Sequence, residues 1–165
     1  MPPSHHRELA NFLKENSDGN PSVTAYRDKN GNRPIPIGQF GRNFFSTIGA
    51  CDIGLPLPAG SFEFSASGSN EWLPNSLASS LYWLAERACD EWPLVCEDVV
   101  KENVKSIYRH MAYVPSPFAL KLSTGQMVKW LLGVPITDNE ISISERAVLE
   151  KAQKTYPEWL FRARA

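Results

Sequence analysis

Cys51 and Asp52 are the first residues whose types could support catalysis. They follow an apolar run in the stretch FFSTIGACDIGLPLP, residues 44–58. With His110 they include the three residue types of a thiol hydrolase: a nucleophile, a base and a carboxylate that orients the base. Nothing in the local sequence is specific to such an enzyme, and a cysteine can equally pack as a small apolar side chain. We therefore expect no catalytic residues and no enzymatic activity, with the hydrolase as the less favoured alternative.

The glycines of this stretch match a phosphate-binding loop only in their spacing. Gly49 and Gly54 have four residues between them, but Leu55-Pro56 occupies the place of the lysine and hydroxyl residue that such a loop requires. The phosphate-loop interpretation therefore fails.

The histidines and cysteines do not have the spacing of a metal site. His5 and His6 are adjacent, in what we expect to be a mobile N-terminus, and HExxH and CxxC patterns do not occur. Cys89 and Cys96 are seven residues apart. We therefore expect no metal ion and no other cofactor.

Acidic residues dominate the segment 86–102, which contains six of them against two basic residues. Glu86, Asp90 and Glu97 belong to this group. Such a segment usually forms a solvated surface. It could also dock a basic protein, because complementary charge accelerates encounter and disfavours wrong partners.

The clearest secondary-structure element is a helix that begins at Pro74, a residue tolerated in the first helical turn. Apolar residues recur at helical spacing and would pack on a sheet; they are Leu77, Leu81, Leu84, Ala85, Ala88 and Trp92. Trp83 falls on the opposite, polar face, so it needs a cover. We favour cover by a neighbouring loop or a third layer over an exposed anchor for a partner.

The other elements follow from shorter patterns. Strands are expected at 23–27, 34–40, 44–48, 61–65, 110–114 and 127–134, and further helices at 7–16 and from Ser142 or Ser144 to Pro157. Asn30-Gly31 is a hairpin signal between the first two strands. Residues 116–125 would form a connecting loop with a possible short strand, and 94–110 could be a short helix or a loop.

Two of these elements carry expectations about burial. In strand 61–65 the alternation places Phe62 and Phe64 toward the core and Glu63 toward solvent. Strand 127–134 is almost entirely apolar, which is typical of a central strand. After the last helix, residues 159–161 (Trp-Leu-Phe) should dock on the body. Together the elements predict one α+β domain over residues 1–165, with a mixed or mainly antiparallel sheet and helices packed on it.

Composition narrows the function further. The 165 residues include 17 basic and 18 acidic side chains, a net charge of -1, so no general field attracts nucleic acid or an anionic membrane. The N-terminus lacks the apolar stretch of a signal peptide, and the longest apolar run, 130–136, is far short of a membrane span. Three cysteines without metal spacing fit a reducing cytoplasm. We expect a cytoplasmic protein without disulfides.

Three stretches together resemble the suppressor of fused family, in particular its short bacterial members. They are FFSTIGACDIGLPLP (44–58), HMAYVPSPF (110–118) and VKWLLGVPITDNE (128–140). The strand SFEFSA and the helix followed by Trp92-Pro93 also fall in the family's order. The resemblance covers roughly residues 10–150.

This resemblance implies an α+β domain without enzymatic activity that works by binding another protein. Short bacterial members look like immunity proteins, which neutralise a cognate toxin of a polymorphic toxin system inside the producing cell. A regulator of a host partner unrelated to toxins is the alternative. The resemblance also implies that Asp52 faces the partner, although it could equally be a turn former whose carboxylate bonds its own loop. We therefore expect Asp52, Trp83, Glu86, Asp90 and Glu97 to be candidates for the partner-binding surface.

Overall fold

The computed structural model describes residues 3–17, 21–27, 34–58, 60–100 and 105–161. The strands are β1 (Ser22–Tyr26), β2 (Ile35–Phe40), β3 (Phe44–Thr47), β4 (Ser61–Ser67), β5 (Leu94–Cys96), β6 (His110–Lys121) and β7 (Met127–Ile136). The helices are α1 (Ser4–Asn16), α2 (Leu73–Ala85) and α3 (Glu145–Thr155), with short 3-10 turns η1 (Ala50–Asp52), η2 (Asp138–Glu140) and η3 (Glu158–Phe161).

The strands form one mixed sheet in the order β1-β2-β3-β4-β7-β6-β5. Only the β4–β7 pair is parallel, and the other neighbours are antiparallel. The predicted α+β class is therefore confirmed, and β7 is central as expected, between β4 and β6. The predicted Asn30-Gly31 turn lies outside the described residues.

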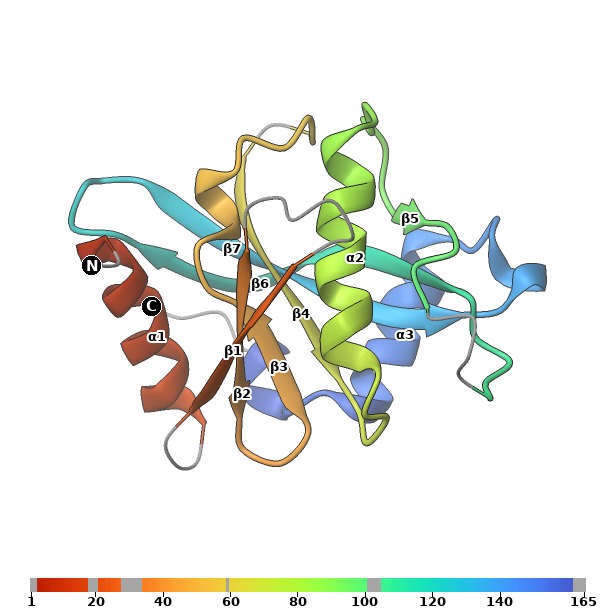
Figure 1. Ribbon diagram of the computed structural model, residues 1–165, viewed down its shortest axis with the longest axis horizontal. Coiled ribbons are helices and arrows are strands. Elements are labelled where there is room, and N and C mark those ends of the chain that lie inside the picture. Colours follow the sequence, from red (N-terminus) through yellow and green to blue (C-terminus); the bar gives the residue numbers. More distant parts are fainter. Residues whose placement is uncertain (1–2, 18–20, 28–33, 59, 101–104, 162–165) are drawn as a thin grey trace.

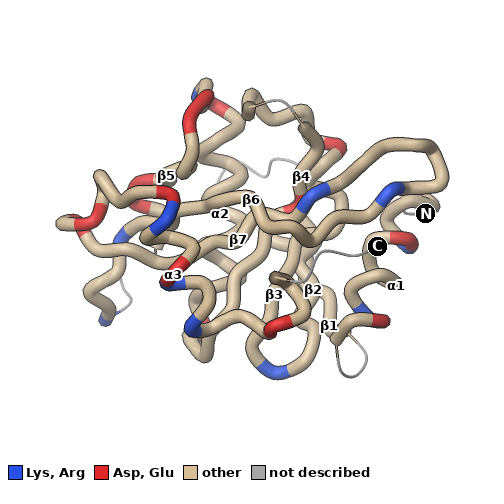
Figure 2. Tube along the Cα trace, turned by 180° about the vertical axis from the view of Figure 1, so that it is seen from behind, with Lys and Arg blue, Asp and Glu red and all other residues tan. Residues whose placement is uncertain are grey.

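Helices cover both faces of the sheet, so the molecule has three layers (Figure 1). On one face, α2 packs its leucines against β2, β4 and β6. On the other, α1, α3 and η3 enclose a second core around Trp130 of β7. Figure 2 shows this second face from behind, with α3 crossing β6 and β7. The expected docking of residues 159–161 is confirmed, with Leu160 fully buried.

Helix α2 ends at Ala85, earlier than its apolar pattern predicts. Ala85 and Ala88 are exposed, so the extension of the buried face to Ala88 and Trp92 was wrong. Beyond the helix the chain bonds another loop, where Cys89 N donates to the carbonyl oxygen of Pro56 at 3.2 Å. Trp92 still packs on the core, with its ring centroid 5.6 Å from that of Phe62.

Strand β6 is longer than expected and continues into the predicted loop at 116–125 as far as Lys121. Its pairing with β7 shifts register between Pro115 and Ala119. Proline lacks a backbone N–H, so Pro115 and Pro117 interrupt the ladder without ending the strand. The undecided segment after Pro93 contributes β5, a short edge strand paired with β6. Among the described residues, no helix is both long and apolar enough to cross a bilayer.

Tyr156, just after α3, ties the helical layer to the central strand. Its hydroxyl accepts from Gly133 N at 2.9 Å and donates to Gly133 O at 2.8 Å, with all these atoms buried. Tyr156→Phe keeps the ring but leaves a buried peptide group without these bonds. We expect the free energy of unfolding to fall by about 1–3 kcal/mol, measured by urea denaturation.

Tyr108→Phe is the matched control, because the Tyr108 hydroxyl makes no hydrogen bond with the described residues. It should leave the unfolding midpoint within experimental error. Equal stability of the Tyr156 variant and the wild type would contradict the role of this bond.

Candidate functional site

Glu63 on β4 is the feature that sequence reasoning placed wrongly. Its side chain is fully buried rather than exposed to solvent. The alternation in β4 is as predicted, with Phe62 and Phe64 in the α2 core. The error arises because the second face of the sheet is also covered, so the residues between the phenylalanines are buried as well.

The Glu63 carboxylate holds the turn that follows β3. Oε1 accepts hydrogen bonds from Thr47 Oγ1 at 2.9 Å, Gly49 N at 2.9 Å and Ala50 N at 3.0 Å. Oε2 accepts from Cys51 N at 2.8 Å. Thr47 Oγ1 itself accepts from Phe64 N, so its proton is directed at Glu63. All four partners are donors, an arrangement that stabilises the ionised carboxylate.

Burial raises the pKa of Glu63, and the hydrogen bonds from Cys51, Thr47 and Ala50 oppose that rise. The pKa of the Cys51 thiol is also raised, first by burial and then by the negative charge of Glu63 and a hydrogen bond to it. Because only the thiolate is nucleophilic, this position is unfavourable for a catalytic cysteine.

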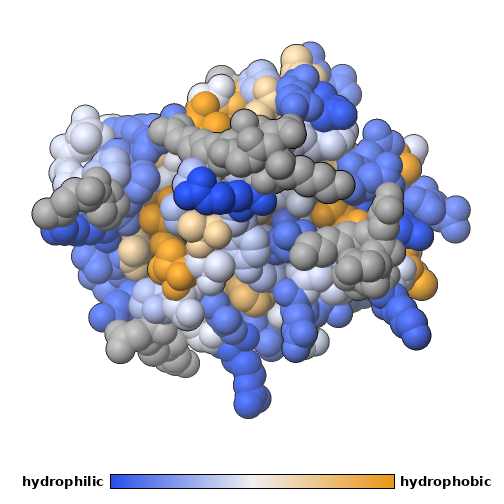
Figure 3. Space-filling model, viewed as in Figure 1, coloured by the Kyte–Doolittle hydropathy of each residue, from blue (hydrophilic) through white to orange (hydrophobic). Residues whose placement is uncertain are grey.

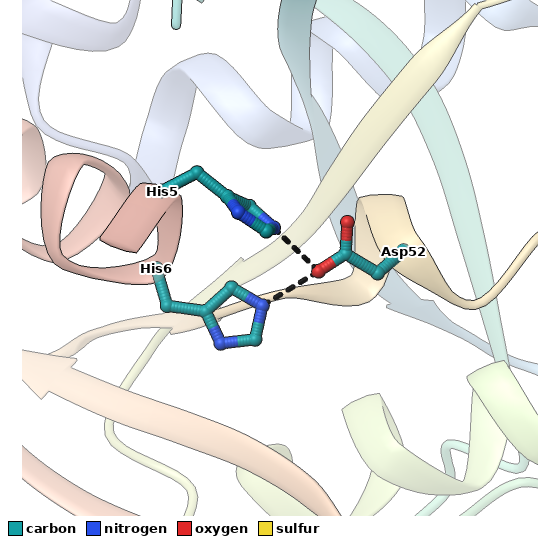
Figure 4. A group of neighbouring side chains, drawn as sticks. All are labelled: His5, His6 and Asp52. Carbon is teal, nitrogen blue, oxygen red and sulfur yellow. Dashed lines mark hydrogen bonds and ion pairs between the residues drawn. The ribbon is translucent and has the colours of Figure 1, made fainter. Parts of the chain in front are cut away.

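Asp52 ends the turn and lies against the first turn of α1 (Figure 4). Its Oδ2 is 2.6 Å from Nε2 of His5 and 2.7 Å from Nε2 of His6. Burial raises the pKa of Asp52, but hydrogen bonds and charge from the two histidines outweigh it, and the net pKa is lowered. The expectation that His5 and His6 lie in a mobile N-terminus was therefore wrong, because helix α1 begins at Ser4 and docks them on Asp52.

Gly49 allows the two segments to approach. Its φ of 101° lies in the left-handed region, which favours glycine. A Cβ at this position would lie 2.5 Å from Cε1 and Nε2 of His6, so the imidazole rests directly on the glycine backbone. His6 and Asp52 line a pocket of about 160 Å³ together with residues 34–36 and Ile48.

The structure does not bring together the residues of the hydrolase alternative. Cys51 follows β3 at the sheet end where β4 begins, whereas His110 opens β6 and pairs with Ile136 at the end of β7. Because β4 and β7 are parallel, these positions are at opposite ends of the sheet. His110 instead bonds Asp138 Oδ1 through Nε2 at 2.7 Å and accepts from Asp98 N at Nδ1.

Trp83 is half-buried at the end of α2 and packs against the α2 core. The Arg87 guanidinium lies 4.3 Å from the ring centroid, and Arg87 donates to the carbonyl oxygen of Trp83. Arg87 therefore covers part of the Trp83 ring, as the sequence pattern predicts for a tryptophan on the polar face of the helix. Arg87 also forms an ion pair with exposed Glu86, whose carboxylate oxygen lies 3.9 Å from the guanidinium nitrogen.

The other acidic candidates divide between two ends of the molecule. Glu86 and Asp90 are exposed in the segment that Cys89 N ties to Pro56, next to the Asp52 turn. Glu97 is also exposed, but β5 runs from that end toward His110, so Glu97 lies at the opposite end. Several of the acidic segments in Figure 2 gather around β5.

Two functional groups were missed in the sequence, for different reasons. Glu63 left a weak signal, because Ser65 and Ser67 on the same strand face are small, as in a closely packed layer. The His5, His6 and Asp52 group left none, since 46 residues separate His6 from Asp52.

Comparison of the sequence with protein families and with curated proteins found no match. Among solved structures, the crystal structure of Drosophila Suppressor of Fused is similar with probability 1.00, a TM-score of 0.47 and 13% sequence identity. The similarity covers 79% of this chain but 37% of the Drosophila chain, so this chain spans well under half of that protein. The likeness is to the fold, and the roles of residues rest on the geometry above.

Replacement of Glu63 tests its hold on the turn. Glu63→Ala leaves three buried N–H groups and a hydroxyl without an acceptor, and should cost at least about 3 kcal/mol of unfolding free energy. Glu63→Gln keeps one acceptor oxygen and should cost less, about 1–3 kcal/mol. Urea denaturation measures both, with Glu150→Gln on exposed α3 as the control. Equal midpoints for all variants would contradict the anchoring role.

Alkylation tests the environment of Cys51. In the folded protein at pH 8, iodoacetamide should modify Cys51 more slowly than free cysteine, because burial and Glu63 raise its thiol pKa. In urea the rate should become normal. Peptide mass spectrometry follows Cys51 and the less buried Cys89 in one sample. A Cys51 that reacts faster than free cysteine in the folded state would restore the hydrolase alternative.

Proposed function

We propose that this chain is a non-enzymatic protein-binding domain that serves as an immunity protein, binding and neutralising a cognate toxin in the producing bacterium. The observation that carries the binding role is the turn after β3, which buried Glu63 holds through three backbone N–H groups and which ends at exposed Asp52. Burying a charge is costly unless every lone pair is satisfied. Here the hydrogen bonds that satisfy Glu63 also hold the turn in one conformation, as expected for a preorganised binding site.

The turn offers a mixed surface suited to a protein partner. Asp52 is exposed, and Ile53, Leu55 and Leu57 are half-buried beside it. In Figure 3, hydrophobic residues on the front face form separate patches bordered by hydrophilic ones. Non-obligate interfaces commonly combine apolar contacts with a polar rim.

Charge favours a basic partner at the same end of the molecule. The hydrogen bond from Cys89 N to Pro56 O joins this turn to the segment with exposed Glu86, Asp90 and Glu91. Arg87 is the single basic residue between 86 and 98 in the sequence. A basic toxin surface would meet complementary charge here, which speeds encounter and disfavours wrong partners.

The toxin-immunity role rests on the resemblance of residues 44–58, 110–118 and 128–140 to short bacterial members of the suppressor of fused family. A regulatory role toward a host partner uses the same surface and differs only in the partner. The hydrolase is disfavoured by the separation of Cys51 from His110 and by the raised pKa of the Cys51 thiol.

Affinity capture from the source cell separates these roles. The tagged chain should retain a protein with a toxin domain, and co-expression should then rescue growth of cells that make this toxin. Capture of a non-toxic protein would support the regulatory role and overturn immunity. Failure to retain any protein, together with turnover of an ester or amide substrate, would overturn the binding role.

Charge reversal tests the surface once the partner is identified. Glu86→Lys/Asp90→Lys should slow association at least about tenfold, because it reverses the local field, and Asp52→Ala should weaken binding at the turn. Glu97→Lys, at the other end of the sheet, tests whether the interface extends there. Surface plasmon resonance at low salt gives the rates.

Glu150→Lys on α3 is the matched control, since Glu150 is exposed on the far face of the sheet from α2. It should bind as the wild type. Unchanged rates for both the double variant and Asp52→Ala would remove this end of the molecule from the interface.

A further inference from the structure

His5, His6 and Asp52 bring three potential metal ligands to one point of the surface. Their ligand atoms all lie within 4.8 Å of one another, and the two imidazoles address the same carboxylate oxygen from adjacent positions in α1 (Figure 4). The two rings meet edge to face, with centroids 4.6 Å apart. We propose that these three side chains bind a divalent transition-metal ion, with zinc as the best-suited ion.

The ligand set matches zinc chemistry. Zinc is bound by imidazole nitrogen at about 2.0–2.1 Å and by carboxylate oxygen at similar distance, in tetrahedral geometry. Such geometry separates the ligand atoms by about 3.3 Å. The Nε2 to Oδ2 distances of 2.6 and 2.7 Å therefore open by less than an ångström when the ion enters. Metal ions that prefer soft thiolate ligands are disfavoured, because no cysteine among the described residues belongs to this group.

A metal ion binds the unprotonated nitrogen of an imidazole, so its binding displaces any proton held on that nitrogen. A neutral imidazole carries its one proton on either nitrogen. In each ring this proton moves from Nε2, where it bonds Asp52, to Nδ1, and the freed Nε2 lone pair binds the ion.

The surroundings hold the ligands and leave a coordination position. His6 rests on Gly49, where even a Cβ would clash with its ring, and Gly49 is fixed by Glu63. Asp52 follows Cys51, whose N–H bonds Glu63 as well. The pocket of about 160 Å³ beside His6 and Asp52 gives room for water or for a ligand group from another molecule as the fourth donor. The buried carboxylate thus acts as a positioning residue for the site.

A bound ion would link α1 to the turn across 46 residues of sequence. Binding only to the folded chain raises its stability by mass action. The side chains remain partly accessible, at 21%, 18% and 31% for His5, His6 and Asp52, so the ion can enter without unfolding. The proposal depends on this geometry and not on the partner proposed above.

Isothermal titration of the EDTA-treated full chain with zinc chloride tests the site. One ion per chain is expected, with a rise in melting temperature. Asp52→Asn and His6→Asn should each weaken binding at least about tenfold, the usual effect of losing even an outer contact to a metal site. Asp138→Asn is the matched control, because it removes the carboxylate of the other histidine–aspartate pair, which has a single imidazole, and it should bind zinc as the wild type.

Histidine ring NMR of the wild type keeps the test independent of variants that fold poorly. Zinc should shift the ring resonances of His5 and His6 and leave those of His110 unchanged. Lack of saturable binding, or shifts at His110 alone, would overturn the proposal. So would equal zinc affinity of the wild type and a folded Asp52→Asn protein.

Discussion

The buried carboxylate of Glu63 is the interaction on which the rest of this end of the molecule depends. Moving a charge out of water costs several kcal/mol, and the cost is offset only where donors satisfy the charge. Here the donors are the Thr47 hydroxyl and the backbone N–H groups of Gly49, Ala50 and Cys51. These bonds hold the chain after β3 against Glu63 on β4. The backbone that presents exposed Asp52 is thus positioned from inside the protein.

Polar anchoring of this kind follows from the three-layer architecture. Because helices cover both faces, the central strands bury polar as well as apolar side chains, and each buried polar group needs a partner. Ser46 accepts from the Trp130 indole, Ser65 donates to the carbonyl oxygen of Leu131, and Tyr156 bonds both groups of Gly133. These bonds specify how β3, β4 and α3 sit on β7, where apolar contact alone would allow sliding.

Local patterns predicted what local physics controls. The leucine spacing located α2, Ser144 caps α3 through Ala147 N, and the apolar run of β7 gave its central place. The failures involve contacts distant in sequence. Glu63 was assigned to solvent because an alternating strand does not reveal a second covering layer. Helix α2 ends at Ala85, and the chain beyond it bonds a distant loop through Cys89 N and Pro56 O. His5 and His6 gained a role only when α1 docked against a turn 46 residues away, which spacing rules cannot anticipate.

The Glu63 carboxylate also affects Cys51 and Asp52 differently, the two residues whose types first suggested catalysis. By accepting from Cys51 N, Glu63 sets its negative charge beside the Cys51 thiol and opposes formation of the thiolate. A turn anchored in this way is an unfavourable place for an activated cysteine, because the anchor and the thiolate would both be anionic. Asp52, one residue further, points toward His5 and His6. The geometry of this stretch therefore favours the proposed ligation and contact at Asp52 over nucleophilic attack at Cys51.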